Sequence, residues 1–219
     1  MLKLGEKGTI LQRDKETYAI APHIACGITT PEQLRTIAEV AEKYKCQALK
    51  LTSAARIAII GIREEDVDAV WSDLKMSPGH AVGLCVRSIK ACPGTQFCRL
   101  GLQDSLGMGM KMDGKFHGYQ LPGKMKMGVS GCTNMCAENC IKDISLVGKK
   151  KGWTVMAGGI GTKKPRLADV IVEELDDRQA LDTIDRLIHF YAENGQKNER
   201  VGRMIDRIGL DALCQAAAG

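Results

Sequence analysis

The first 75 residues alternate between strand-like and helix-like hydrophobic patterns. Residues 17–22, 47–52 and 56–62 are apolar runs typical of strands. Thr30-Pro31-Glu32-Gln33 predicts a helix start, because Thr can cap it, Pro fits the first turn and Gln completes a capping box. A second helix is predicted from residues at i, i+3, i+4 and i+7: Val67, Val70, Trp71 and Leu74. This β-α-β-β-α order predicts an α+β fold with a ferredoxin-like N-terminal domain.

The rest of the chain predicts a mixed α/β region followed by helices. Ser77-Pro78-Gly79 breaks the pattern, so we expect domains at residues 1–77, 78–175 and 176–219. Residues 124–129, 144–147 and 153–157 are candidate strands. Residues 101–123 are rich in Gly and Met and predict a long loop, with a short helix near residues 102–106. The last 44 residues carry two amphipathic patterns, which predict helices that pack on the core.

Composition narrows the class of protein. The chain has 219 residues, 44% of them hydrophobic, and a net charge of +5. Nucleic-acid binding would need a denser basic stripe, and the few aromatic residues offer no base-stacking platform. No apolar run reaches membrane-spanning length, and the first residues lack a signal-peptide pattern, so we expect a cytoplasmic protein. Nine cysteines in a reducing compartment favour metal binding over disulfides.

Four of these cysteines form two pairs in small-residue settings. Cys92 and Cys98 are separated by Pro-Gly-Thr-Gln-Phe. Cys132 directly follows Ser-Gly, and Thr-Asn-Met separates it from Cys136. Four thiolates from two segments suit a cubane iron–sulfur cluster, which needs soft sulfur ligands around a compact volume. A structural zinc site and buried free thiols are the alternatives, although the spacing of the first pair is long for zinc. If the second segment is helical, Cys140 shares a face with Cys132 and Cys136 and could replace either.

Several segments of the sequence resemble the sirohaem-containing sulfite and nitrite reductase family. They include the two cysteine motifs, Leu121-Pro122-Gly123-Lys124-Met125-Lys126, Leu146-Val147-Gly148, and Gly158-Gly159-Ile160-Gly161 with Pro165-Arg166. The likeness runs from about Pro22 to Arg166, with the segments in the same order as in the family. The chain is also similar in size to the single-subunit assimilatory-type sulfite reductases. The resemblance implies a [4Fe–4S] cluster beside sirohaem. It also implies that Cys136 both ligates the cluster and supplies the axial thiolate of the sirohaem iron.

Basic residues near these motifs are candidates for binding an anion. Lys124 and Lys126 are two residues apart, so on a strand both ammonium groups lie on one face while Met125 and Met127 lie on the other. Fixed cations there would lower the cost of placing an anion on an electron-rich metal. Arg56 and Arg87 resemble arginines that bind the anion in the family, although some members carry the first one at the position of Ala54.

Other polar residues are candidates for contacts with the cofactors. Sirohaem carries eight carboxylates, and Lys163, Lys164 and Arg166 follow a glycine-rich turn from which they could neutralise some of them. Asn134, between the paired cysteines, could donate hydrogen bonds to the cofactor or to cluster sulfur. The four histidines show no ligand spacing.

The sequence therefore predicts a six-electron reduction of sulfite to sulfide. Nitrite reduction to ammonia on the same cofactors is one alternative, and an iron–sulfur electron carrier without catalysis is another. No dinucleotide or flavin motif is present, so we expect electrons from a ferredoxin-like or other carrier protein. Larger members of the family contain two fused copies of this unit, whereas this chain has one. We therefore expect a homodimer in which Lys124 and Lys126 could serve the pocket of the neighbour.

Overall fold

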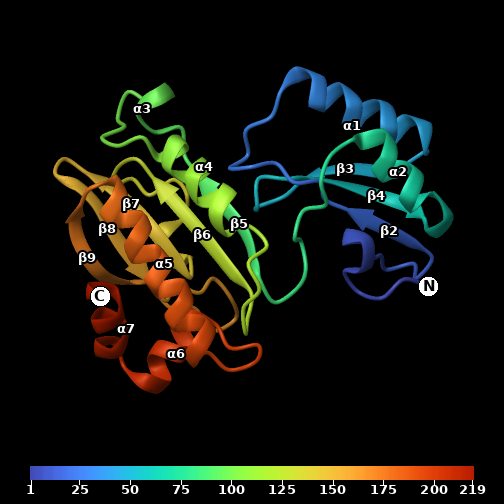
Figure 1. The fold of residues 1–219 in the computed structure, drawn as a ribbon. Helices are drawn as coiled ribbons and strands as arrows, with labels where there is room; N and C mark the ends of the chain where they lie inside the picture. Colours follow the sequence, from blue (N-terminus) through green and yellow to red (C-terminus); the bar gives the residue numbers. More distant parts are fainter. The chain divides into compact units, whose positions relative to one another are not determined.

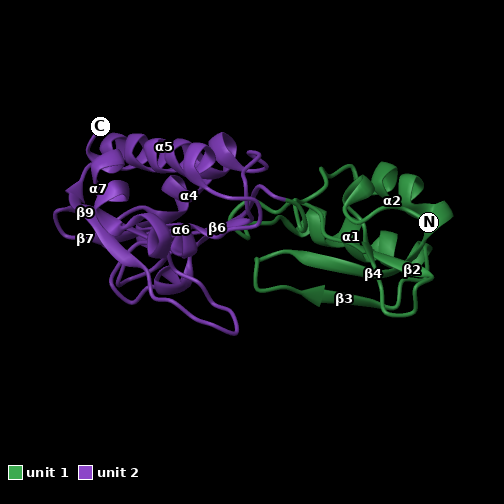
Figure 2. Ribbon diagram, turned by 90° about the horizontal axis from the view of Figure 1, so that it is seen from below, with its two compact units in different colours: residues 1–83 green, residues 84–219 purple.

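The computed structural model describes residues 1–219, which form two compact units. Unit 1 comprises Met1–Gly83 and unit 2 comprises Leu84–Gly219 (Figure 2). The finer division of the chain at residues 77 and 175 stays a prediction. None of the helices combines the length and the apolar character needed to cross a bilayer.

Unit 1 is an antiparallel sheet in the order β1-β2-β4-β3 with two helices packed on it (Figure 1). Ferredoxin-like topology places the first and third strands side by side, as β2 and β4 are here, with the second strand outside them. β1 occupies the remaining edge beside β2. The elements are η1 (Glu6–Gly8), β1 (Ile10–Leu11), β2 (Thr17–Ile20), α1 (Pro31–Lys43), β3 (Ala48–Leu51), β4 (Ile57–Arg63), η2 (Glu64–Asp66) and α2 (Val67–Leu74).

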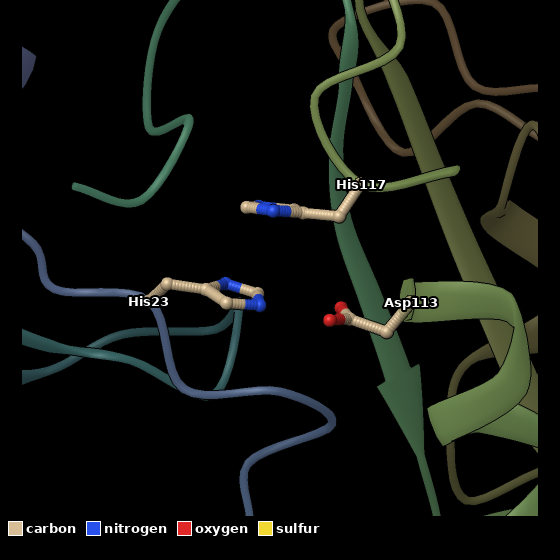
Figure 3. Close-up of side chains that lie close together, drawn as sticks. All are labelled: His23, Asp113 and His117. Carbon is tan, nitrogen blue, oxygen red and sulfur yellow. The ribbon is translucent and has the colours of Figure 1, made fainter. Parts of the chain in front are cut away.

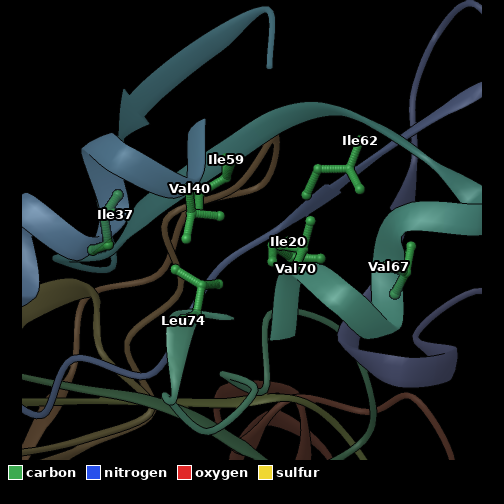
Figure 4. Close-up of a cluster of buried hydrophobic side chains, with 8 residues drawn as sticks. All are labelled: Ile20, Ile37, Val40, Ile59, Ile62, Val67, Val70 and Leu74. Atoms are coloured by element: carbon green, nitrogen blue, oxygen red, sulfur yellow. The ribbon is translucent and has the colours of Figure 1, made fainter. Parts of the chain in front are cut away.

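The local signals in the sequence account for these elements. The Thr30 hydroxyl accepts a hydrogen bond from the Gln33 N–H at 3.2 Å, and the Gln33 side-chain oxygen accepts one from the Thr30 N–H at 3.0 Å. This is the predicted capping box, and it fixes where α1 begins. Apolar residues from both helices and from β2 and β4 then form one buried cluster (Figure 4): Ile20, Ile37, Val40, Ile59, Ile62, Val67, Val70 and Leu74.

Unit 2 is built on a five-stranded mixed sheet in the order β5-β6-β7-β8-β9 (Figure 1). β5, β6 and β7 run parallel, while β8 and β9 continue the sheet in antiparallel pairing. The elements are β5 (Val86–Ala91), α3 (Gly94–Phe97), α4 (Ser105–Phe116), β6 (Met125–Ser130), η3 (Asn139–Ile141), β7 (Ile144–Lys149), β8 (Gly152–Ala157), β9 (Asp169–Leu175), α5 (Asp177–Asn194), α6 (Val201–Ile208) and α7 (Leu210–Ala218).

The prediction of a long loop over residues 101–123 is wrong in the centre of this segment, where α4 runs for 12 residues. Its glycines lower helix propensity, yet Met108, Met112 and Phe116 recur at i, i+4 and i+8 and are buried. Asp104 caps the helix by accepting a hydrogen bond from the Gly107 N–H at 2.9 Å. Contacts of α4 with β5 and β6 outweigh its weak propensity, and α5 packs on β8 of the same sheet.

Candidate functional site

The two cysteine pairs follow the carboxyl ends of neighbouring parallel strands. Cys92 comes directly after β5, and Cys132 comes two residues after β6. The register pairs Ala91 with Val129, and the Cys92 N–H donates to the Val129 carbonyl at 3.0 Å. Because parallel strands end at the same edge of a sheet, the first cysteine of each pair lies at that edge.

Two glycines let the cysteine segments touch. A Cβ placed on Gly131 would lie 2.9 Å from the Cα of Gly94, so neither position leaves room for a side chain. The Gly131 N–H donates to the Cys92 sulfur at 3.2 Å, and its carbonyl accepts from the N–H groups of Leu102 and Gln103 at 2.8 and 3.0 Å. The segment that follows Cys98 is thereby held against the segment that precedes Cys132.

The segment from Cys132 to Cys140 is not a continuous helix. Met135 and Glu138 have φ angles of 51° and 61°, in the left-handed region. The condition under which Cys132, Cys136 and Cys140 would share a helical face is therefore not met. Cys140 lies in η3, where its thiol contacts the Met135 sulfur at 3.3 Å.

A buried polar network fixes this segment on the sheet. The fully buried side chain of Asn139 donates to the Leu146 carbonyl at 2.7 Å and accepts from the Ser130 hydroxyl at 2.5 Å. The same hydroxyl accepts from the Ala137 N–H at 3.0 Å. Buried polar groups that bond one another in this way specify a single backbone path. The segment directly after Cys136 is therefore held by β6 through Ala137 and by β7 through Asn139.

An ion-pair cluster holds the outer side of the same segment. Glu138 accepts from Lys90 of β5 at 2.8 Å and from Lys142 at 2.9 Å. These two hydrogen bonds lower the pKa of the Glu138 carboxyl to about 2. The Lys142 side chain is 8% exposed, and no sequence motif marks this lysine for the role.

The donor set fits the predicted cluster and a group bound beside it. None of the nine cysteines forms a disulfide. Cys92, Cys98 and Cys132 are half-buried, and Cys136 is exposed. The exposed Cys136 thiol is the one of the four that is most accessible to a second group.

The two predicted lysines lie at the other end of β6. Met125 and Met127 are fully buried, whereas Lys124 and Lys126, which alternate with them, are half-buried, as the strand alternation predicts. Desolvation lowers the pKa of Lys126, and the charges of Lys142, Arg200 and Lys124 lower it further, against the opposing charge of Asp143. The sequence did not reveal Arg200 or Asp143, which have no motif and lie 57 residues apart.

The two predicted arginines belong to different units. Arg87 lies on β5 of unit 2, where desolvation and then the charge of Arg200 lower its pKa against the raising influence of Cys85. Arg56 directly precedes β4 in unit 1 and is 4% exposed. Gly79 makes room for it, since a Cβ there would lie 3.2 Å from the Arg56 Nε. A shared substrate site for Arg56 and the lysines of unit 2 stays a prediction.

The residues predicted to contact sirohaem carboxylates differ in exposure and in hydrogen bonding. Lys163 and Lys164 are exposed in the loop between Ile160 and Arg166, which form a β-bridge. The Arg166 guanidinium instead donates to Asp206, Asp169 and the Gly158 and Leu167 carbonyls at 2.6 to 3.2 Å. This arrangement favours a structural role for Arg166. Asn134 is exposed in the turn between Cys132 and Cys136.

Figure 3 shows three further side chains, outside the cysteine motifs, of the types that can bind a metal ion. Asp113 and His117 come from the last turn of α4 and the residue after it, and the His117 N–H donates to the Asp113 carbonyl at 3.0 Å. His23 follows β2 in unit 1, and its N–H donates to the Ser77 carbonyl at 2.9 Å. Asp113 and His117 together supply fewer protein ligands than a zinc site needs, so unit 2 by itself forms no such site here.

The chain belongs to the nitrite and sulfite reductase family. Residues 82–218 match the "Nitrite and sulphite reductase 4Fe-4S domain", and residues 10–77 match the "Nitrite/Sulfite reductase ferredoxin-like half domain". The first match covers more than half of the chain. The family, the ferredoxin-like N-terminal fold and the iron–sulfur domain expected from the sequence are confirmed.

Two relatives illustrate the range of the family. The chain is 44% identical over 213 residues to "Sulfite reductase, assimilatory-type" of Nitratidesulfovibrio vulgaris, covering 97% of this chain and 98% of the relative. It is 38% identical over 200 residues to "Nitrite reductase [NAD(P)H]" of Bacillus subtilis, covering 91% of this chain. The chain spans only 25% of that nitrite reductase.

Solved structures show the same fold at low sequence identity. The crystal structure of dissimilatory sulfite reductase I has a TM-score of 0.83 at 12% identity, covering 92% of this chain and 69% of that one. The Mycobacterium tuberculosis NirA protein has a TM-score of 0.82 at 16% identity, covering 92% of this chain and 39% of that one. The fold class predicted from the sequence is therefore confirmed.

The Asn139 network generates a test that needs no cofactor. Asn139→Ala leaves the Ser130 hydroxyl and the Leu146 carbonyl without their buried partner, so we expect a loss of about 2–4 kcal/mol in the free energy of unfolding. Denaturant unfolding of the cofactor-free protein measures this loss. Asn134→Ala is the matched control in the same segment, and its exposed amide should cost less than about 0.5 kcal/mol. Equal stability of the two variants would contradict the anchoring role of Asn139.

Proposed function

We propose that this protein is a sulfite reductase that converts sulfite to sulfide with six electrons. The carrying observation is the contact between the two cysteine segments at Gly94 and Gly131, beyond the neighbouring ends of β5 and β6, because each segment carries one pair of thiols. The similarity to an assimilatory-type sulfite reductase along almost the whole of both chains supports sulfite as the substrate. Nitrite is the second candidate substrate, because nitrite reductases are also among the relatives.

The cofactors are a [4Fe–4S] cluster and sirohaem. Cys92, Cys98, Cys132 and Cys136 would hold the cluster, and the exposed Cys136 would also ligate the sirohaem iron. When bound, the two groups supply the electrons and the iron to which the anion binds. Lys163 and Lys164 would pair with sirohaem carboxylates, and Asn134 would donate hydrogen bonds to the cofactors. The donor set and the exposure of Cys136 support these assignments.

The basic residues of the chain would bind sulfite and assist its protonation. Arg56, Arg87, Lys124 and Lys126 would attract the anion and stabilise charge on its oxygens. The reduction removes those oxygens as water, so it consumes protons as well as electrons. A lysine with a lowered pKa is a better proton donor near neutral pH than an ordinary lysine, and burial lowers the pKa of Lys126 in this way.

A carrier protein would deliver the electrons, and a second copy of the chain would complete the site. Lys126 lies near the start of β6 and Ser130 at its end, so roughly 13 Å of strand separates the lysines from the edge that bears the cysteines. This separation supports the hypothesis that the lysines serve the pocket of a neighbouring copy of the chain. A cytoplasmic location stays a prediction.

Unit 1 offers a surface that fits such a second copy. The edge strand β3 is exposed along its whole length, and the Leu51 side chain on it is 74% exposed. Beside it is a largely apolar cavity of about 350 Å³, lined in part by Leu34, Leu51 and Ile57. An unpaired edge strand beside apolar surface is a template for pairing with another strand.

Turnover with a reduced artificial electron donor tests the proposed activity. We expect purified holoprotein to show the visible bands of an isobacteriochlorin and to reduce sulfite faster than nitrite. Lys126→Ala should lower the rate about tenfold or more, because it removes a cation that stabilises the reacting anion, while the visible spectrum stays unchanged. Lys150→Ala, in the exposed β7–β8 turn, is the matched control. Protein that contains iron and sulfide but no tetrapyrrole would instead be an electron carrier.

Cys136→Ser tests the shared ligand. A thiolate common to both groups predicts that this substitution perturbs the visible bands of sirohaem together with the spectrum of the cluster. Cys214→Ser, which changes a cysteine of α7 outside both motifs, should leave both spectra unchanged. A Cys136→Ser protein that loses only cluster absorbance and keeps unaltered sirohaem bands would rule out the bridging assignment.

Sedimentation of the holoprotein tests the second copy. We expect a dimer, and Leu51→Glu should convert it to monomer, because the substitution places a charge in the edge-strand contact. Leu167→Glu changes a similarly exposed leucine in unit 2 and should leave the dimer intact. A wild-type protein that is fully active and monomeric at working concentration would disprove the shared site.

A further inference from the structure

A buried ion pair lies directly beside the backbone of Lys126. Asp143 is fully buried, and the Arg200 guanidinium approaches it as a fork, with Nε and Nη2 each 2.6 Å from one carboxylate oxygen. One of those oxygens also accepts from the Lys126 N–H at 2.7 Å, and the Asp143 N–H donates to the Lys126 carbonyl at 2.9 Å. Both main-chain groups of Lys126 are therefore bonded to Asp143.

The position of Lys126 in the sheet explains why it needs this partner. The ladder between β6 and β7 begins at Met127 and Ile144, one residue after Lys126 and Asp143. The Asp143 carboxylate thus supplies an acceptor for the Lys126 N–H at the point where the ladder starts. The carboxylate itself is fixed by Arg200, which lies immediately before α6.

The segment that carries Arg200 also contacts the residues before Lys124. The Asn198 N–H donates to the Pro122 carbonyl at 2.8 Å, and the Tyr191 hydroxyl donates to the Glu199 carbonyl at 2.5 Å. A Cβ on Gly123 would lie 2.0 Å from that Glu199 carbonyl oxygen, so the two backbones are in direct contact. The connection between α5 and α6 therefore contacts both ends of the segment that bears the two lysines.

We propose that Asp143 and Arg200 are positioning residues for the substrate anion, because they hold the backbone from which Lys124 and Lys126 reach it. This inference rests on the proposed function, which assigns sulfite binding to those lysines. Asp143 and Arg200 do not themselves contact the anion. They act by keeping the lysine-bearing start of β6 in one place and by setting the charge around Lys126.

The charges around Lys126 give this role a signature that a purely structural pair lacks. Asp143 raises the pKa of Lys126, while Lys142, Arg200 and Lys124 lower it, and Glu138 partly neutralises Lys142. Removing Arg200 should therefore raise the pKa of Lys126, and removing the charge of Asp143 should lower it. The two substitutions act in opposite directions on the same titration.

The affinity of the oxidised holoprotein for sulfite, measured without an electron donor across the titration range of lysine, tests the proposal. We expect Arg200→Gln to weaken sulfite binding near neutral pH by about tenfold to a hundredfold and to move the alkaline loss of binding to higher pH. Asp143→Asn should move that loss to lower pH. Arg200→Lys keeps the charge but not the fork, so it should weaken binding without moving the pH dependence.

Two further variants keep the test decisive. Asp143→Leu combined with Arg200→Leu replaces the buried pair by apolar side chains, a change that proteins often tolerate. This double variant should fold, retain the visible bands of its cofactors and still bind sulfite weakly. Arg203→Gln, in the first turn of α6 and paired with Asp206 on the surface, is the control that should bind sulfite normally.

The outcomes separate this inference from the proposed function. Cofactor-loaded wild-type protein that binds no sulfite would overturn the function itself. Wild-type binding that is matched in affinity and pH dependence by the Asp143 and Arg200 variants, with only their unfolding temperatures lowered, would overturn the positioning role and leave the function standing.

Discussion

The parallel pairing of β5, β6 and β7 is the constraint on which the rest of unit 2 depends. Parallel strands end at one edge, so the segments that follow β5 and β6 meet there, and each carries the first cysteine of a pair within two residues of its strand. The same strand, β6, begins with the lysines at its opposite end. One strand thus sets the positions of a sulfur-rich edge and of a cationic end, and the glycines at 94 and 131 let the two cysteine segments touch at the first.

Burial of charge at the cationic end has a cost that the fold offsets locally. An unpaired carboxylate as buried as that of Asp143 would destabilise the fold by about 3–5 kcal/mol. The Arg200 guanidinium offsets this cost by donating two hydrogen bonds to the Asp143 carboxylate. Desolvation, and then the charges of Lys142, Arg200 and Lys124, lower the pKa of Lys126. A dianion bound beside Lys126, as proposed, would offset those positive charges and favour the protonated lysine. Anion binding and proton supply would then be coupled through the same few side chains.

The sequence predicted what local patterns encode. The capping box at Thr30, the helical spacing after Val67 and the strands around Arg56 are short-range signals, and the structure follows them. The two cysteine motifs are equally local. α4 was missed because its glycines hide the buried Met108–Met112–Phe116 spacing, and β9 and α7 were missed as well. The Asp143–Arg200 pair could not be predicted, since it joins positions 57 residues apart that only the folded sheet and helices bring together.

The exposure of Cys136 follows from how its neighbours are anchored. The left-handed residues Met135 and Glu138 turn the chain out of a helix on either side of it. The residue after it, Ala137, is bonded to Ser130 and fully buried, so the backbone there has no freedom to move. Asn139 then ties the segment to β7. A restrained backbone leaves less freedom to lose on binding, which would lower the entropic cost of the proposed ligation by Cys136.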